Sequence, residues 1–478
     1  MPRRPHFLLI VADDQTHRSL HALNHPGVHT PNLDRLAARG TCFTRARHQG
    51  SWQGAVCVAS RAMLHTGRAI YRCGGDDCGD HVLLGEHLRR YGYRTAGVGK
   101  WHNGAASRAR SFAQDLCHEG GMYASSPFDF EALAPRGDPA VSAYLRPAPG
   151  NRWRPDDRGL GGHWLDAHPP RREPAQHSSA RWADRAIGVL TDHAAAGVGP
   201  DADPLFLYLA FHAPHDPRQA PAEDLERYPP GEIELPPNVL PRHPFDQGDF
   251  ALRDEQLAPW PRTDEVVRTH LCEYYAILTH MDRELGRVFA ALDAAGLADD
   301  TVVCFTADHG LAVGQHGLMG KQNQYEHSLG VPLIWAGPGV PVGERRDALC
   351  YQHSTFATAC DLLGLAPPGG LDFPGLTAAM HDPRVRPHDA AFGAYRDFQR
   401  SVRDDTHKLI VYPHLPRLQL FDLAADPWET RDLAASVSTD PAVNAVAQRL
   451  FERLQQLQQD VGDTLDLTEL GPVPLTGV

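Results

Sequence analysis

An uninterrupted apolar run near the N-terminus, residues 6–12, constrains the fold of this chain more than any other feature. A strand without polar alternation is typical of a parallel sheet that is covered by helices on both faces. Strand-like and helix-like segments then alternate along most of the chain. The sequence therefore predicts an α/β fold, with a large, mostly parallel sheet sandwiched by helices.

Two long irregular stretches interrupt this alternation. Strands are predicted at residues 6–12, 93–99, 204–211, 301–306 and 331–336, and helices at residues 30–40, 83–91, 179–194 and 263–295. The longest helix has Thr263 as its predicted cap and Gly296 as its stop. Residues from about 104 to 175 and from 216 to 262 lack periodicity, and we expect them to form loops that shape a binding pocket.

The pattern changes near residue 375. Residues 407–412 and 418–423 predict a β-hairpin, and residues 443–458 predict a terminal helix. We therefore expect a catalytic α/β domain at residues 1–375 and a smaller α+β subdomain with an antiparallel sheet at residues 376–478.

Charge and cysteine content exclude several classes of protein. A net charge of −13 over 478 residues argues against nucleic acid and against an anionic membrane as partners.

The chain has no run of about 18 apolar residues, so we expect no transmembrane helix. The N-terminal apolar run is too short for a signal peptide, which predicts a cytoplasmic protein. Cys73 and Cys78 have zinc-like spacing without a second matching pair, and reduced, buried thiols are predicted instead.

Polar residues follow four of the predicted strands: Asp13 with Asp14, Lys100 with His102, His212 with His215, and Asp308 with His309. Sites in open α/β sheets form beyond the carboxyl ends of the strands, so we expect these side chains to converge. The three carboxylates and the His309 imidazole suit a divalent cation such as Ca²⁺, Mg²⁺ or Mn²⁺. Taken singly, each aspartate cluster could instead cap a turn.

Cys57 lies at the start of a helix-like segment, four residues before Arg61. A helix N-terminus favours negative charge, and Arg61 would lie one turn away on the same face. This pattern fits a reactive group that handles an anion. The alternative is a small buried core residue, as most cysteines of this kind are.

Lys100, His102, His215 and Lys321 add cationic and titratable groups to the predicted site. With a metal ion, such groups suit an anionic ester, whose charge must be neutralised and whose leaving oxygen must be protonated. Lys321 alone would be interpreted as a surface lysine. His212 fits a core or supporting role better than a catalytic one.

The segment Cys57-Val58-Ala59-Ser60-Arg61, followed by Thr66-Gly67-Arg68, resembles the C-x-[P/A]-S-R and T-G-R signature of type I sulfatases in the alkaline phosphatase superfamily. The similarity continues in order over most of the chain, at Gly99-Lys100-Trp101-His102, Ala213-Pro214-His215-Asp216-Pro217, Asp308-His309-Gly310, Gly314-Gln315-His316-Gly317, Tyr325-Glu326-His327-Ser328 and Leu420-Phe421-Asp422-Leu423.

This resemblance implies an enzyme, a sulfuric ester hydrolase that cleaves the sulfate monoester of a carbohydrate or a small molecule. A maturation enzyme would oxidise Cys57 to formylglycine. One hydroxyl of the formylglycine hydrate would attack sulfur, and the other would later expel sulfate. Asp13, Asp14, Asp308 and His309 would bind one divalent ion together with the modified Cys57; Ca²⁺ is expected first, with Mn²⁺ and Mg²⁺ as alternatives.

By the same resemblance, Arg61 would hold the hydrated aldehyde, and Lys100 with His102 would poise it for attack. His215 and Lys321 would bind the sulfate group and protonate the leaving alcohol. Ala59 stands where proline is the commonest residue, and this departure affects how efficiently Cys57 would be converted.

His309 stands where many arylsulfatase-like members have asparagine, and it leaves the metal and the substrate class open. Histidine also occurs there in phosphonate monoester hydrolases. The alternative is therefore a phosphonate monoester or phosphodiester hydrolase with the same nucleophile. A third hypothesis is a member that binds sulfate esters without catalysis. The sequence specifies no oligomeric state.

Overall fold

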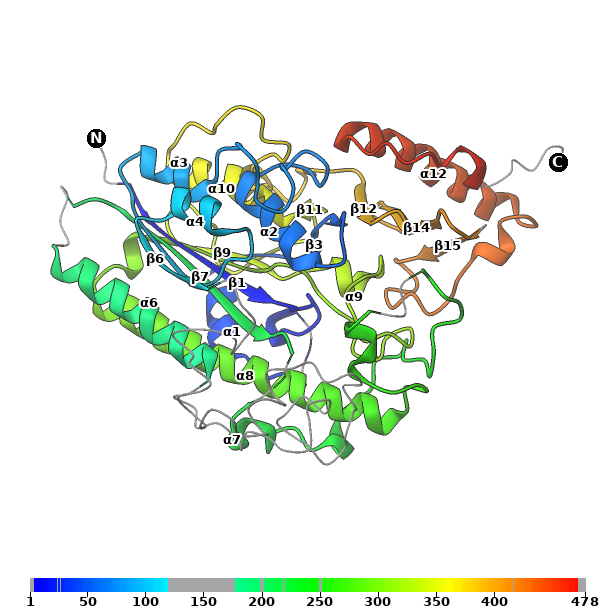
Figure 1. The fold of residues 1–478 in the computed structure, drawn as a ribbon, viewed down its shortest axis with the longest axis horizontal. Helices are drawn as coiled ribbons and strands as arrows, with labels where there is room; N and C mark the ends of the chain where they lie inside the picture. Colours follow the sequence, from blue (N-terminus) through cyan, green and yellow to red (C-terminus); the bar gives the residue numbers. More distant parts are fainter. Residues whose placement is uncertain are drawn as a thin grey trace.

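An eight-stranded sheet forms the centre of the molecule, in the strand order β10-β2-β9-β8-β1-β7-β5-β6 (Figure 1). The computed structural model describes residues 4–118, 177–197, 202–248 and 252–471, apart from positions 24, 26, 217, 219 and 416. The strands of this sheet are β1 (His6–Asp13), β2 (Gly40–Phe43), β5 (Arg94–Lys100), β6 (Gln114–His118), β7 (Leu205–Pro214), β8 (Thr301–Ala307), β9 (Leu333–Ala336) and β10 (Glu344–Arg346).

The middle of the sheet is parallel, as the sequence predicts. β1 pairs in parallel with both β7 and β8, so that Ile10 lies between Leu209 and Phe305. Every residue of β1 is buried, which explains its lack of polar alternation. β9 is the exception, because it runs antiparallel to both of its neighbours. An antiparallel neighbour needs no crossover helix, and only the short helix α9 (Glu326–Leu329) lies between β8 and β9 in the described chain.

Helices cover both faces of the sheet, which confirms the predicted sandwich. One face carries α1 (Pro31–Ala38), α6 (Ser178–Ala195) and α8 (Asp264–Ala294), and the other carries α2 (Val56–Thr66), α3 (Leu84–Arg90), α4 (Ala105–Ser111) and α10 (Thr355–Leu362) (Figure 1). The Thr263 hydroxyl accepts a hydrogen bond from the Val266 amide at the start of α8, as the sequence predicts for a cap.

The predicted irregular stretch at residues 104–175 contains two regular elements, α4 and β6. β6 is an edge strand whose first residues are exposed and polar, so it lacks the apolar pattern of a buried strand. The greater part of that stretch, residues 119–176, lies outside the described residues. In the second predicted stretch, the described chain includes the short helices α7 (Ala222–Leu225), η3 (Pro230–Glu232) and η4 (Asp254–Leu257).

A second sheet has the strand order β15-β14-β13-β12-β4. Its C-terminal strands are β12 (Ala391–Tyr395), β13 (Gln399–Arg403), β14 (His407–Tyr412) and β15 (Arg417–Asp422), and they are antiparallel. The predicted hairpin is thus confirmed, and α12 (Pro441–Val461) contacts this sheet.

The edge strand β4 (Gly50–Ser51) comes from the N-terminal part of the chain and pairs in parallel with β12. Gly50 has φ +89°, and a Cβ there would lie 1.8 Å from the Ala394 carbonyl oxygen, so the contact requires glycine. The first 375 residues therefore contribute a strand to the C-terminal sheet. The remaining short elements are η1 (His21–Leu23), β3 (Ala46–Arg47), η5 (Ala298–Asp300), β11 (Cys350–Tyr351), η6 (Gln352–Ser354), α11 (Thr377–His381), η7 (Ala434–Ser436) and η8 (Thr468–Leu470).

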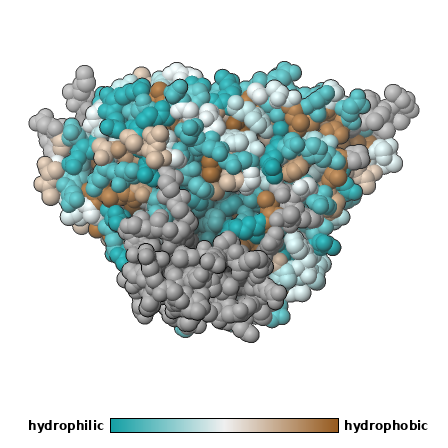
Figure 2. All heavy atoms as spheres, in the orientation of Figure 1, coloured by the Kyte–Doolittle hydropathy of each residue, from teal (hydrophilic) through white to brown (hydrophobic). Residues whose placement is uncertain are grey.

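The visible surface is largely hydrophilic, with hydrophobic residues in small, scattered groups (Figure 2). A hydrophilic hollow lies near the centre of this view, where the carboxyl end of β1 lies in Figure 1. Within the described ranges, none of the helices combines the length and the apolar character that crossing a membrane requires.

Candidate active site

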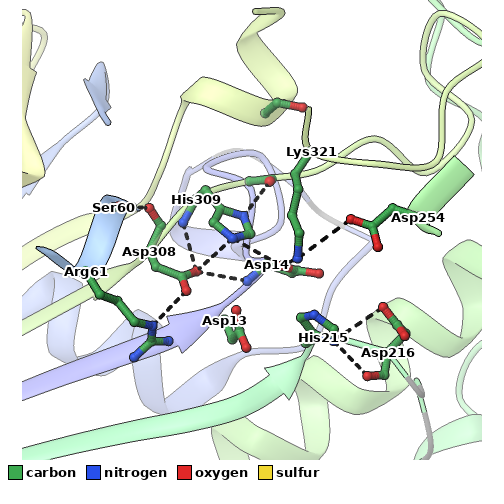
Figure 3. A network of polar contacts seen from close by, with 12 residues as sticks. Asp13, Asp14, Ser60, Arg61, His215, Asp216, Asp254, Asp308, His309 and Lys321 are labelled. Atoms are coloured by element: carbon green, nitrogen blue, oxygen red, sulfur yellow. Dashed lines mark hydrogen bonds and ion pairs between the residues drawn. The ribbon is translucent and has the colours of Figure 1, made fainter. Parts of the chain in front are cut away.

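Asp13, Asp14, Asp308 and His309 converge at the carboxyl ends of β1 and β8 (Figure 3). These two strands are parallel neighbours with Ala12 opposite Ala307, and this register places both polar clusters side by side. One potential ligand atom from each of the four residues lies within 4.8 Å of the others, and all four side chains are buried. The sequence prediction that the two clusters meet is correct.

Each carboxylate of this cluster has its own cationic partner. The Lys100 ammonium contacts Asp13, the Lys321 ammonium lies 2.7 Å from Asp14 Oδ1, and Arg61 Nε lies 3.0 Å from Asp308 Oδ2. Lys321 is buried rather than exposed, so the interpretation of this residue as a surface lysine is wrong. The three cations come from α2, the end of β5 and the loop before α9.

Burial and neighbouring charges shift the pKa values of the ionisable groups in this site in opposite directions. Burial alone would raise the pKa of Asp13, but Lys100 and other nearby cations hold it well below its usual range. Burial and the neighbouring Asp13 carboxylate raise the pKa of Asp308 to about 7, despite Arg61. Burial opposes the charged form of Lys100, but Asp13 and Cys57 raise its pKa.

Two buried acceptor atoms of this cluster have no hydrogen-bond partner in the described part of the chain. They are Asp13 Oδ1 and His309 Nε2. His309 Nδ1 lies 2.9 Å from the Gly310 carbonyl oxygen, which holds the ring so that Nε2 points to the aspartates (Figure 3). A divalent cation would engage both acceptors and favour the charged form of Asp308. The oxygen-rich donor set fits Ca²⁺, Mg²⁺ or Mn²⁺.

Cys57 lies in the first turn of α2, with its Sγ within 4.8 Å of potential ligand atoms of Asp13 and His309. Burial would raise the pKa of this thiol, but Lys100, the neighbouring His309 and Lys321 lower it. The alternative interpretation as an ordinary core cysteine does not fit these polar neighbours.

Arg61 follows one turn later and is fully buried. Its Nη1 donates to the Tyr208 hydroxyl at 2.8 Å and to the Lys100 carbonyl at 3.1 Å, while Nε binds Asp308. Its Nη2 has no hydrogen-bond partner among the described residues. Arg61 therefore anchors Asp308 and still has one free donor for a polar group beside Cys57.

The histidines of the predicted site fall into two groups. His102 and His215 are partly exposed at the ends of β5 and β7, whereas His212 is buried and accepts a hydrogen bond from Trp182 Nε1 at 3.1 Å. Burial and Lys100 lower the pKa of His102 to about 3, so this ring is neutral. The placement of His212 agrees with its predicted core role.

Asp216, Arg253 and Asp254 at the edge of the site were not predicted. His215 Nδ1 lies 2.7 Å from the Asp216 carbonyl oxygen and 3.3 Å from its Oδ1. Arg253 binds the Asp216 carboxylate with both terminal nitrogens and also reaches Asp254, which lies 4.0 Å from Lys321 Nζ. Asp216 was identifiable from the motif around His215, but Arg253 and Asp254 lie at the start of the short helix η4, where the sequence has no clear signal.

Ser60 and Gln352 hold the backbone of the site in place, and their roles too were missed. The Gln352 amide donates to the Asp308 carbonyl oxygen at 2.7 Å and to the Ser60 hydroxyl at 2.6 Å. The Ser60 hydroxyl donates to the same carbonyl. These contacts fix the backbone that carries Asp308 and His309. Ser60 belongs to the signature segment, but Gln352 is almost 300 residues away in sequence.

Comparisons with known proteins agree with this geometry. Residues 5–365 match the protein-family model described as Sulfatase. A protein named Sulfatase from Formosa agariphila is 26% identical over 460 residues, covering 89% of this chain and 82% of the relative. The multifunctional alkaline phosphatase superfamily protein PehA of Trinickia caryophylli is 28% identical over 478 residues, covering 88% of each. The phosphonate monoester hydrolase of Agrobacterium radiobacter shares the fold, with a TM-score of 0.76 at 24% identity over 99% of this chain and 100% of that one.

Proposed function

The chain belongs to the sulfatase family of sulfuric ester hydrolases, and we propose that its nucleophile is a formylglycine made from Cys57. The observation that carries this proposal is the position of Cys57. Its sulfur lies beside potential metal ligands, at a helix N-terminus and in the field of two buried lysines, Lys100 and Lys321. The proposed substrate is the sulfate monoester of a carbohydrate or a small molecule.

Asp13, Asp14, Asp308 and His309 are the proposed ligands of a divalent cation, with Ca²⁺ as the first candidate and Mn²⁺ or Mg²⁺ as alternatives. Such an ion supplies a Lewis acid that stabilises negative charge on sulfate oxygens. The unpartnered atoms Asp13 Oδ1 and His309 Nε2 support this assignment. Lys100 and Lys321 neutralise two of the carboxylates from the sides.

The remaining residues prepare the ester for cleavage. The hydrated formylglycine supplies the oxygen nucleophile at position 57. Arg61 Nη2 is available to bind this group, since its other nitrogens are engaged. Lys321 binds a sulfate oxygen. The contact of His215 Nδ1 with Asp216 leaves Nε2 to protonate the leaving alcohol.

Intact mass spectrometry of the protein produced with a formylglycine-generating enzyme tests the nucleophile. Conversion of Cys57 replaces sulfur by oxygen and removes two hydrogens, and the rate of aryl sulfate hydrolysis should rise in proportion to the converted fraction. The Cys57→Ala variant is the control. Sulfatase activity that is independent of conversion would contradict the proposal.

A phosphonate monoester or phosphodiester hydrolase is the second candidate, because the relative PehA is named multifunctional and is similar over most of its length. Rates on an aryl sulfate and on a phenylphosphonate ester, measured on the same converted protein, separate the two candidates. A higher specificity constant for the phosphonate would favour the second.

A further inference from the structure

A second polar cavity lies where the loop after β1 meets the C-terminal sheet, and we call it the junction cavity. It has a volume of about 210 Å³, and no residue of the proposed catalytic or metal site lines it. Its ionisable lining residues are His17, Arg18, Arg45, Glu326, Arg403 and Asp405. Three guanidinium groups thus face two carboxylates.

Arg403 is the least satisfied of these groups. It is 7% exposed, and its buried Nε has no hydrogen-bond partner among the described residues. Its nearest charged partner is Glu326, with 3.6 Å between Nε and Oε2. A buried donor of a charged group without an acceptor is unfavourable, so an acceptor that enters the cavity would stabilise Arg403.

Glu326 is shared among several cations, and its Oε2 lies beyond hydrogen-bond distance of Arg403 Nε. Arg47 contacts its Oε1, and the Lys408 ammonium lies 3.1 Å from the same oxygen. The second buried carboxylate, Glu429, lies 2.8 Å from Lys408. Arg47 Nε also lacks a hydrogen-bond partner in the described part of the molecule. Two guanidinium nitrogens of this cluster, Arg47 Nε and Arg403 Nε, are therefore without an acceptor among the described residues.

The other two arginines are held at the cavity wall. Arg45 is about one-third exposed and pairs with the exposed Asp405 at 3.0 Å. The Arg18 guanidinium lies over the Trp428 ring, 3.9 Å from its centroid. Burial lowers the pKa of Arg403 to about 10, and the charges of Arg47 and Arg45 add to this shift. The Glu326 carboxylate only partly opposes it, so the charge of Arg403 is poorly compensated.

We propose that the junction cavity is a second anion site, which binds a tetrahedral oxyanion such as sulfate between Arg403, Arg45 and Arg18. Guanidinium groups match two oxygens of such an anion at once, and their charge is fixed at all physiological pH values. The proposal does not depend on the chemistry at Cys57.

Calorimetric titration of the whole protein with sodium sulfate, at ionic strength held constant with sodium chloride, tests this site. We expect two sulfate-binding events in the natural sequence, one at the catalytic centre and one at the junction cavity. Arg45→Gln should weaken the second event at least about tenfold and leave the first unchanged. Arg45 is chosen because it is partly exposed, so its loss leaves no buried charge.

Arg386→Gln is the matched control, because Arg386 also pairs with an exposed aspartate, Asp347, at 2.8 Å and does not line the cavity. Arg403→Gln should remove the second event altogether, provided that its circular dichroism spectrum is native. A single sulfate-binding event in the natural sequence would overturn the proposal. Equal titrations of the Arg45 and Arg386 variants would overturn it as well.

Discussion

Two buried ion clusters share the loop that follows β1, and they differ in the atoms that have no hydrogen-bond partner among the described residues. In the catalytic cluster these are acceptor atoms of Asp13 and His309 together with one donor nitrogen, Arg61 Nη2. In the junction cluster around Glu326, they include donor atoms of Arg47 and Arg403. Both clusters mix carboxylates with cations, so net charge does not distinguish them. The unpartnered atoms do: free acceptors indicate a cation, and free donors indicate an anion.

The largest expected effect is a loss of turnover when a carboxylate of the catalytic cluster is removed. Asp13→Asn removes a proposed metal ligand and leaves Lys100 without its carboxylate. Turnover should fall by about 10³-fold, because charge stabilisation by the metal ion is lost. Metal content after dialysis, measured by mass spectrometry, should fall with it. Asp184→Asn, at a surface pair with Arg287, is the control and should change neither quantity. Full metal content in the Asp13 variant would refute its assignment as a ligand.

The second effect is a loss of folding stability when the central carboxylate of the junction cluster is removed. Glu326→Gln leaves Arg47, Lys408 and Arg403 without their shared carboxylate. The free energy of unfolding should fall by about 3–5 kcal/mol in urea titrations, because breaking a buried ion pair leaves uncompensated charge. The metal content per folded molecule should not change. Glu452→Gln, at an exposed position on α12, is the control. A stability loss of the same size in both variants would contradict the prediction.

The third effect is a pH dependence of stability at the junction. Burial lowers the pKa of His17 to about 3. The charges of Arg18, Arg403 and Arg47 lower this pKa as well, and the Glu326 carboxylate opposes the shift. The unfolded chain, with a pKa of about 6.5, binds this proton more readily. Full stability is therefore present above pH 6.5 and is lost as the pH falls towards 3. At pH 5 the loss from this one residue is about 2 kcal/mol.

Urea unfolding of His17→Gln at pH 7, 6 and 5 measures this loss, since the variant should lose less stability than the natural sequence over that range. His29→Gln, at an exposed histidine, is the control. The same pH slope in the His17 variant and in the natural sequence would show that His17 does not titrate on unfolding.

The smallest effect concerns the exposed edge of the catalytic cluster. Asp216→Asn weakens the contacts that orient His215 and frees Arg253. If His215 protonates the leaving alcohol, the specificity constant should fall about tenfold for alkyl sulfates and less for nitrophenyl sulfate, whose leaving group needs no proton. Asp347→Asn is the control. An equal loss for both kinds of substrate would indicate a purely structural role for Asp216.

The sequence was sufficient to predict the parts of the fold that repeat a periodic pattern. The apolar run of β1, the capped helix α8 and the hairpin β14–β15 all occur where they were expected. The convergence of Asp13 with Asp308 was also predictable, because polar residues at the ends of neighbouring parallel strands must meet.

The parts that were missed depend on contacts between distant segments. The direction of β9 depends on its neighbours, and β4 is a strand only because β12 pairs with it. Gln352 supports Asp308 across a large sequence separation. Arg403 lies in an ordinary strand pattern, and only the packed structure shows that its Nε has no hydrogen-bond partner among the described residues. Local periodicity contains none of this information.

The pairing of β4 with β12 implies a minimum time during synthesis in which Cys57 stays accessible for the proposed modification. Cys57 lies six positions after Ser51, and it is 4% exposed once the chain has folded. Its pocket cannot close before Lys321 has been synthesised, and Gly50 cannot pair before Ala394, 344 positions later. At about 5–20 residues per second, translation of that interval takes roughly 20–70 seconds. Within that interval, a maturation enzyme would meet the thiol on an open, nascent chain.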